Sequence, residues 1–211
     1  MTMNLKSIEK TVHTKTTTTL QGKLIVPGNR SPEGMAIIVK ALDKQILPEL
    51  KEFVITIKDK KLFPDLGIIP SHQEIRICNA SDNGNSVNHN IYSPGPLYPF
   101  DMGIIEKTDT TGKIINPMQG KRQLNKGILS IYCSIYEGIE GHYKVVSSNE
   151  RGTVVQKDGF FSFDNLPPGK YHLSVWQKEQ RFNNHEITIK LPLTHRLQIN
   201  LFRPRIRNSQ K

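Results

Sequence analysis

The stretch Gly127–Val146, GILSIYCSIYEGIEGHYKVV, decides the fold predicted for the rest of the chain. Its first seven residues alternate, with Leu129, Ile131 and Cys133 on one side, and period-two alternation rich in Ile and Tyr predicts a β-strand. A loop containing two glycines then leads to a second predicted strand, His142–Val146. Because Cys133 would end the first strand facing inward, just before a short loop, it is the first candidate for a functional residue.

The composition favours strands over helices. The 211 residues include 13 Pro and 15 Gly, spread between many short runs of Ile, Val, Tyr and Phe. Such spacing predicts an all-β class. No apolar run is long enough for a transmembrane helix, and Met1–Leu20 is polar, so we expect neither a membrane span nor a signal peptide. Two cysteines do not make a disulfide framework, and the alternation that places Asn79 on one strand face turns Cys78 to the other, so we expect no bridge between Cys78 and Cys133.

The net charge of +10 comes from 29 Lys and Arg against 19 Asp and Glu. Basic residues gather at Lys58–Lys61, at Lys121–Lys126 and in Arg203–Lys211. This balance could direct the protein to acidic partners, or it could be a solvated surface with a loose tail. Because no nucleic-acid motif accompanies the charge, we expect an unidentified protein or an acidic surface as the partner, and no specific nucleic acid.

One segment is ambiguous between a helix and a strand. After Ser31, the residues Met35, Ile38, Leu42 and Ile46 recur at helical spacing, whereas Ala36–Val39 is largely β-branched. Elsewhere, alternation bounded by Gly, Pro, Asn and Asp predicts strands at Gln21–Pro27, Phe53–Ile57, Glu74–Asn79, Gly152–Gln156, Phe160–Phe163, Tyr171–Trp176, Glu186–Leu191 and Arg196–Phe202.

The middle of the chain resembles the cupredoxin-like domain of methylamine-utilisation-type and plastocyanin-like proteins. The landmarks stand in the family's order: Phe63-Pro64, a strand that ends at Asn79, His89-Asn90-Ile91-Tyr92-Ser93, Phe100-Asp101-Met102-Gly103, and Gly127 to Cys133. The resemblance implies that His89 and Cys133 are copper ligands. It also implies that Asn79 supports the site by hydrogen bonding beside the thiolate.

The loop after the cysteine departs from that family. The family supplies a second histidine and a methionine as C-x-x-H-x-x-M, but here Tyr136 and Ile139 stand at those positions. A phenol is protonated at neutral pH and is a poor ligand, and isoleucine has no lone pair. His142 is expected to face outward if Tyr143 packs inward. The loop Asp82–Asn88 is also longer than is usual for the family, which affects the placement of His89.

Both ends of the chain resemble a carboxypeptidase-regulatory-like (prealbumin-like) β-sandwich. The segments are GKLIVPGNRSPEGMAIIVKA, from Gly22, and DGFFSFDNLPPGKYHLSVW, from Asp158, and they favour a strand at Ala36–Val39. The two resemblances together predict an all-β protein in which a cupredoxin-like Greek-key sandwich is inserted in, or packed on, the second sandwich. The expected divisions are a flexible lead at 1–17, a discontinuous sandwich at 18–47 plus 147–202, a cupredoxin-like domain at 48–146, and a basic tail at 203–211.

Three functions follow from this pattern. The first is a non-catalytic binding or structural module with a degenerate copper site, in which Cys133 is a buried apolar side chain and His89 a hydrogen-bonded loop residue. The second is an electron-transfer or copper-carrier protein in which Glu137, Glu140 or Tyr136 joins His89 and Cys133. The third is a hydrolase that uses Cys133 with His89 or His142.

We expect the first function. The prediction is therefore a protein that is not an enzyme and has no bound cofactor, with copper as the alternative. The family resemblance implies a location in the bacterial periplasm or envelope, but it does not establish a role in amine metabolism.

Overall fold

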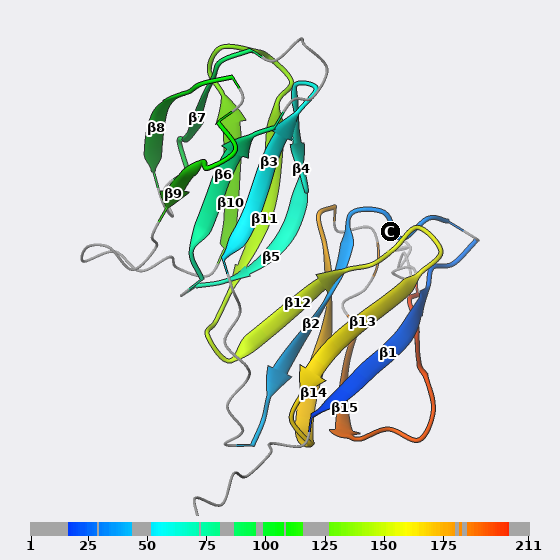
Figure 1. The fold of residues 1–211 in the computed structure, drawn as a ribbon. Coiled ribbons are helices and arrows are strands. Elements are labelled where there is room, and N and C mark those ends of the chain that lie inside the picture. The colour runs from blue at the N-terminus through cyan, green and yellow to red at the C-terminus, as the bar shows by residue number, and fades with distance from the viewer. Residues whose placement is uncertain are drawn as a thin grey trace, which may run out of the picture.

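The computed structural model describes residues 17–28, 30–43, 52–71, 73–80, 87–95, 99–107, 109–115, 127–179, 182 and 185–202. Within these residues the chain is all-β, as expected, with strands arranged in four sheets (Figure 1). No helix in the described part is long and apolar enough to cross a membrane. The basic segments at 121–126 and 203–211, most of the lead at 1–17 and the expected boundary at 47/48 fall outside the described residues, so the predicted domain limits stay predictions.

The first pair of sheets, here called the terminal sandwich, combines strands from both ends of the chain. One sheet has the order β13-β1-β16 and the other has the order β12-β2-β14-β15. These strands are β1 (Thr18–Ile25), β2 (Met35–Ala41), β12 (Glu150–Val154), β13 (Phe160–Leu166), β14 (Gly169–Gln177), β15 (Glu186–Leu191) and β16 (Leu197–Asn200). Leu24 of β1 and Tyr171 of β14 lie in one hydrophobic core, although almost 150 residues separate them in sequence.

The second pair of sheets, here called the central sandwich, is formed by the strands between β2 and β12. Its sheets have the orders β5-β11-β10-β7-β8 and β4-β3-β6-β9. The strands are β3 (Phe53–Lys58), β4 (Lys61–Phe63), β5 (Leu66–Pro70), β6 (Ile75–Asn79), β7 (His89–Ser93), β8 (Phe100–Ile105), β9 (Lys113–Ile115), β10 (Gly127–Cys133) and β11 (Glu140–Val146).

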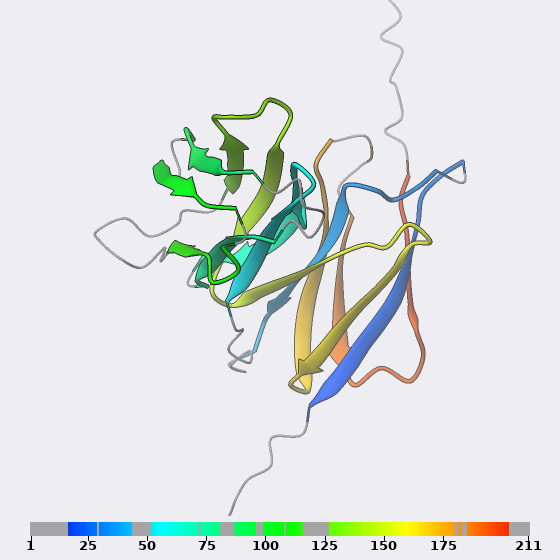
Figure 2. The ribbon, with the colours of Figure 1, turned by 45° about the horizontal axis from the view of Figure 1, so that its top comes forward.

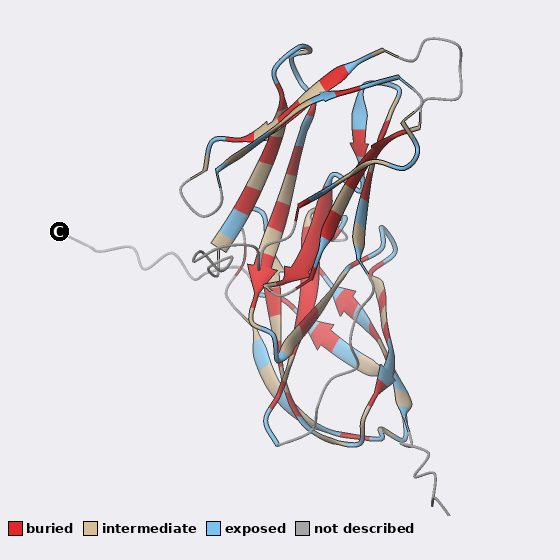
Figure 3. Ribbon diagram, turned by 60° about the vertical axis from the view of Figure 1, so that its left-hand side comes forward, coloured by how far each residue is buried: buried red, intermediate tan, exposed pale blue. Residues whose placement is uncertain are grey.

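Alternating burial along β10 matches the expected inner and outer faces. Leu129, Ile131 and Cys133 are buried in the core of the central sandwich, whereas Ile128 and Tyr132 are more accessible. Figure 3 shows buried and more accessible positions following one another along several strands. A strand has this pattern when one of its faces packs on a core and the other meets solvent. The prediction that Cys133 ends the strand facing inward is confirmed.

Strands β2 and β5 do not alternate, because both of their faces are covered. All five residues of β5 are buried: Ile69 faces the core of the central sandwich, and Ile68 packs with Ala36 and Ile38 of β2. Within the segment that was ambiguous between helix and strand, Met35–Ala41 is therefore a strand, whereas Ile46 lies outside the described residues. Strand β5 itself was not predicted, because a short run buried on both faces has no period-two signal.

The two sandwiches meet where β12 packs against β5 (Figure 2). The junction is apolar and consists of Ala36, Ile38, Ile68 and Val146, with Trp176 packed against them. Gly152 of β12 lies directly on the Ile68 side chain, and a Cβ at this position would overlap it. The absence of a side chain at Gly152 thus sets how closely the sandwiches approach.

Replacing Gly152 by alanine should force the sandwiches apart. Overpacking of this kind costs about 1–3 kcal/mol of unfolding free energy. We expect urea unfolding, followed by the fluorescence of Trp176, to show this loss, since Trp176 is the only tryptophan. The change Ile68→Ala in the same chain removes two of the three overlapping atoms, Cγ1 and Cγ2, and keeps the Cβ, so the double variant should lose less than the sum of the two single losses. Additive losses would show that the two residues are not in contact.

Candidate functional site

The expected ligand pair comes together in the central sandwich. His89 begins β7 and Cys133 ends β10, and these strands are antiparallel neighbours that pair Cys133 with Ile91. The Cys133 Sγ lies 3.5 Å from the His89 Nδ1. Both residues are buried, with exposed fractions of 0% for His89 and 8% for Cys133. For typical metal–sulfur and metal–nitrogen bond lengths, a tetrahedral ion would need these two atoms about 3.5 Å apart. The scaffold thus keeps the spacing of two ligands.

Two side chains cover this pair. The Tyr136 ring meets the His89 imidazole edge to face, with centroids 5.4 Å apart, and the Lys60 Nζ lies 4.6 Å from the centroid of the Tyr136 ring. Lys60 comes from the turn between β3 and β4, where Asp59 and Lys60 both have left-handed backbone angles, φ 49° and 56°. Two such residues in succession are typical of the tight turns that join hairpin strands. The sequence showed a basic turn here but gave no sign that its Lys60 contacts Tyr136.

The His89 imidazole is held neutral. Burial lowers its pKa below the ordinary value of 6.5, and the positive charge of Lys60 lowers it further. Its Nε2 is buried and has no hydrogen-bond partner among the described residues. A proton added to this ring would therefore create a buried charge next to an ammonium group, without a counter-ion in the described part of the chain.

Asn79 is buried and bonds to the backbone of two segments near His89. Its Nδ2 donates to the carbonyl oxygens of Val87 and Glu106, at 2.8 and 3.1 Å. Val87 lies two residues before His89, and Glu106 follows Ile105, the residue that pairs with His89 across β8. Asn79 therefore links the start of β7, which holds His89, to the end of β8. The expected hydrogen bond beside the Cys133 sulfur stays a prediction.

The other candidate ligands do not complete a metal site. Glu137 is exposed in the loop after Cys133, and Ile139 is 3% exposed in the hydrophobic core. His142 faces outward, as expected, and contacts the Ser130 Oγ (3.1 Å) and a Glu140 carboxylate oxygen (3.6 Å). Among the described residues, no three His, Cys, Asp or Glu side chains are close enough together to hold one metal ion. The residues present do not fit the ligand set of a blue-copper centre.

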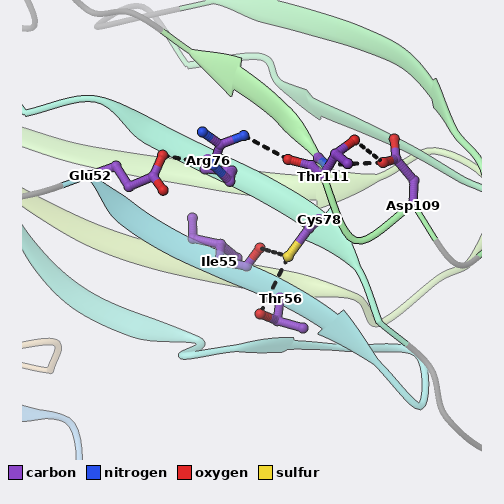
Figure 4. A network of polar contacts seen from close by, with 8 residues as sticks. Glu52, Ile55, Thr56, Arg76, Cys78, Asp109 and Thr111 are labelled. Atoms are coloured by element: carbon purple, nitrogen blue, oxygen red, sulfur yellow. Dashed lines mark hydrogen bonds and ion pairs between the residues drawn. The ribbon is translucent and has the colours of Figure 1, made fainter.

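Cys78 lies on the other face of its sheet and is not bonded to Cys133. Both cysteines are free, as predicted. The Cys78 sulfur contacts the Thr56 hydroxyl at 3.6 Å and the Ile55 carbonyl at 3.8 Å (Figure 4). Beside it, Arg76 joins Glu52 to the Thr111 carbonyl oxygen (Figure 4). This outer network is structural and is turned away from the His89–Cys133 pair.

Comparison with known families gives a match to part of the chain. Residues 135–210 match a family described as ER membrane protein complex subunit 7, beta-sandwich domain. The matched segment begins in the loop after Cys133 and includes β11 to β16, about a third of the chain. No match was found among curated proteins. The resemblance of the two chain ends to a carboxypeptidase-regulatory-like sandwich stays a prediction.

Several solved structures are similar to part of the chain at low identity. A novel purple cupredoxin from Nitrosopumilus maritimus is 19% identical, with a TM-score of 0.34 over 45% of this chain and 100% of that one. A Cu-containing nitrite reductase (NirK) from Thermus scotoductus SA-01 is 14% identical, with a TM-score of 0.35 over 51% of this chain and 25% of that one. The reduced P94F mutant of amicyanin is 12% identical, with a TM-score of 0.30 over 51% of this chain and 98% of that one.

Removing the ammonium group of Lys60 should raise the pKa of His89. In Lys60→Met, the imidazole keeps its burial but loses the neighbouring positive charge, so its NMR titration should move toward the ordinary value of 6.5. Lys61→Met, in the same hairpin, is the matched control and should leave the titration unchanged. Equal titrations in Lys60→Met and the wild type would show that the two groups do not interact.

The same shift makes stability depend on pH. Because the folded state disfavours the protonated ring, the contribution of His89 to stability is fully present above the unfolded pKa, near 6.5, and decreases as the pH falls below it. In Lys60→Met this decrease should be smaller.

Removing the Asn79 amide should destabilise the protein strongly. Asn79→Ala removes a buried amide that donates to the Val87 and Glu106 carbonyl oxygens, and we expect a loss of roughly 1–3 kcal/mol in the free energy of unfolding. His142→Ala, on the outer face of β11, should cost less than about 1 kcal/mol. Urea titrations that give equal losses for both variants would contradict the role assigned to Asn79.

Proposed function

We propose that this protein is a non-catalytic binding or structural module in which the metal site of a cupredoxin-like sandwich is closed. The observation that carries the proposal is the stack of Lys60, Tyr136, His89 and Cys133. It keeps two of the expected ligands and covers them with a phenol ring and a cation.

The electrostatics of this stack oppose a bound cation. Lys60 already carries a positive charge close to His89, and a second cation on the imidazole would be repelled by it. Tyr136 offers a protonated phenol, and Ile139 offers only hydrocarbon packed in the core. The position where a third and a fourth ligand would stand is therefore filled by groups that bind metal poorly.

Burial also supports a non-catalytic role. A nucleophile must reach its substrate, but Cys133 and His89 are both buried, and the Tyr136 ring packs on the His89 imidazole. His142 contacts Ser130 on the outer face of its sheet, whereas Cys133 faces the core. Burial of His89 and Cys133 thus favours a packing role for the two side chains over a role as a catalytic nucleophile and its base.

A second function, an atypical copper carrier or electron-transfer protein, has one observation in its favour. The 3.5 Å separation between the Cys133 Sγ and the His89 Nδ1 suits a single bridging ion. This function requires Tyr136 to swing away and Glu137, which is now exposed, to turn inward.

A role within an assembly is part of the proposal. The matched family is described as a β-sandwich domain of a membrane complex subunit, which supports the holding of a protein partner over the conversion of a substrate. The net charge of +10 supports a partner or surface of acidic character. A periplasmic or envelope location rests on the family resemblance in the sequence.

Copper titration tests the closed site. The wild-type protein should show no intense thiolate-to-copper absorption with Cu(II), because two ligands are missing. The double change Tyr136→His and Ile139→Met should restore a four-ligand set and produce this band, together with tighter binding. The same variant with Cys133→Ser should lose the band, since the band requires the thiolate. A strong band in the wild type would overturn the closed-site proposal and favour the carrier.

A further inference from the structure

A cleft of about 860 Å³ lies between the two sandwiches. Segments far apart in sequence line it: the loop that precedes β2, the connection from β4 to β5, the end of β12, and the end of β14. Its volume is within the range of clefts that hold a ligand or a short peptide. None of its lining residues belongs to the His89–Cys133 site.

Among the described residues, the end of β12 presents a backbone edge to this cleft that no other strand pairs with. β12 is the outermost strand of its sheet and, within the part of the chain that the structure describes, pairs with β2 alone. The N–H of Val155 bonds to the Met35 carbonyl, so the strand's alternation turns the N–H and C=O of Val154 away from β2. Val154 lines the cleft, and 38% of its surface is exposed. A free edge of this kind can accept an added strand.

The charges of the cleft are balanced. Its lining includes three cationic and three carboxylate side chains, which are Arg30, Lys157, Lys178, Glu33, Asp65 and Glu179. In a chain of net charge +10, this neutral lining does not favour a polyanion. A lining with both cationic and carboxylate side chains complements a ligand that itself has both positive and negative groups and a polar main chain. A polypeptide is a ligand of this kind.

The walls are held at a fixed separation. The contact between Gly152 and Ile68 and the apolar junction around it fix β12 against β5. On the far wall, the Gln177 side chain exchanges two hydrogen bonds with the backbone of Phe182, at 3.0 and 3.1 Å. A peptide entering this cleft would therefore meet a preformed edge, which reduces the entropic cost of binding.

We propose that the cleft binds an extended polypeptide segment, which adds as a strand to the edge of β12 at Val154. The proposal names a ligand class and a site for the binding module proposed above, and it rests on that function. The main-chain groups of Val154 would exchange hydrogen bonds with the peptide backbone, and the Val154 side chain would contact one of its apolar residues. Recognition of this kind depends mainly on the peptide main chain and tolerates many sequences.

The test uses the full chain labelled with ¹⁵N and a pool of pentapeptides randomised at all positions, at millimolar concentration. We expect amide shift changes confined to the end of β12 and the facing residues Asp65 and Leu66. Val154→Pro removes the outward N–H without breaking a bond to β2, and it should abolish these changes. The matched control Val154→Thr keeps the N–H and should retain them.

A second probe does not depend on the folding of a variant. A pool of the same pentapeptides with N-methylated backbones cannot donate hydrogen bonds to the edge and should leave the wild-type spectrum unchanged. Strand addition would be overturned if the ordinary pool left the amide shifts of the cleft residues unchanged. It would also be overturned if the methylated pool, or the ordinary pool with Val154→Pro, gave the same shift changes as the ordinary pool gives with the wild type. None of these results bears on the copper titration, which alone decides whether the metal site is closed.

Discussion

The packing of Ile68 on the bare backbone of Gly152 is the contact on which the arrangement of the two sandwiches depends. It requires a strand, β5, that is apolar on both faces, since one face completes the central core and the other meets β2 and β12. Interiors are packed so closely that even one added methyl group is felt. The junction therefore makes a single body of two sandwiches that each have their own core.

In the proposed function, the His89–Cys133 pair is the part of a metal site that packing keeps in place without the other ligands. The strand pairing of β7 with β10 still brings the two side chains together, because the core of the central sandwich requires it. The loop that would supply further ligands instead contributes Tyr136 to a stack beneath Lys60, and Ile139 to the core. On this proposal, Tyr136 and Ile139 contribute to packing at the positions where further metal ligands would stand.

Residues that alternate could be predicted from the sequence. The inward face of β10, the outward face of His142 and the opposite directions of Asn79 and Cys78 all follow from period-two patterns. Strand β5 could not be found, since burial on both faces removes the pattern. The contact between Lys60 and Tyr136 was not predicted, because it joins a hairpin turn to a loop 76 positions away. Local sequence patterns carry no information about contacts between residues that are so far apart in sequence. The carbonyl partners of Asn79 were missed for the same reason.

The pairing of the first strands with the last ones has a consequence for synthesis on the ribosome. Among the described strands, β1 pairs with β13 and β16, and β2 pairs with β12 and β14, so neither finds these partners until at least a hundred further residues have been made. The central sandwich has all its strands earlier and can fold first, because domains generally fold as units during translation. Until β12 and β14 have been synthesised, the apolar segment of β2 has no strand partner, and an unpaired apolar strand is prone to aggregate. The central sandwich, once folded, would offer β5 as the first apolar surface on which β2 can be sheltered.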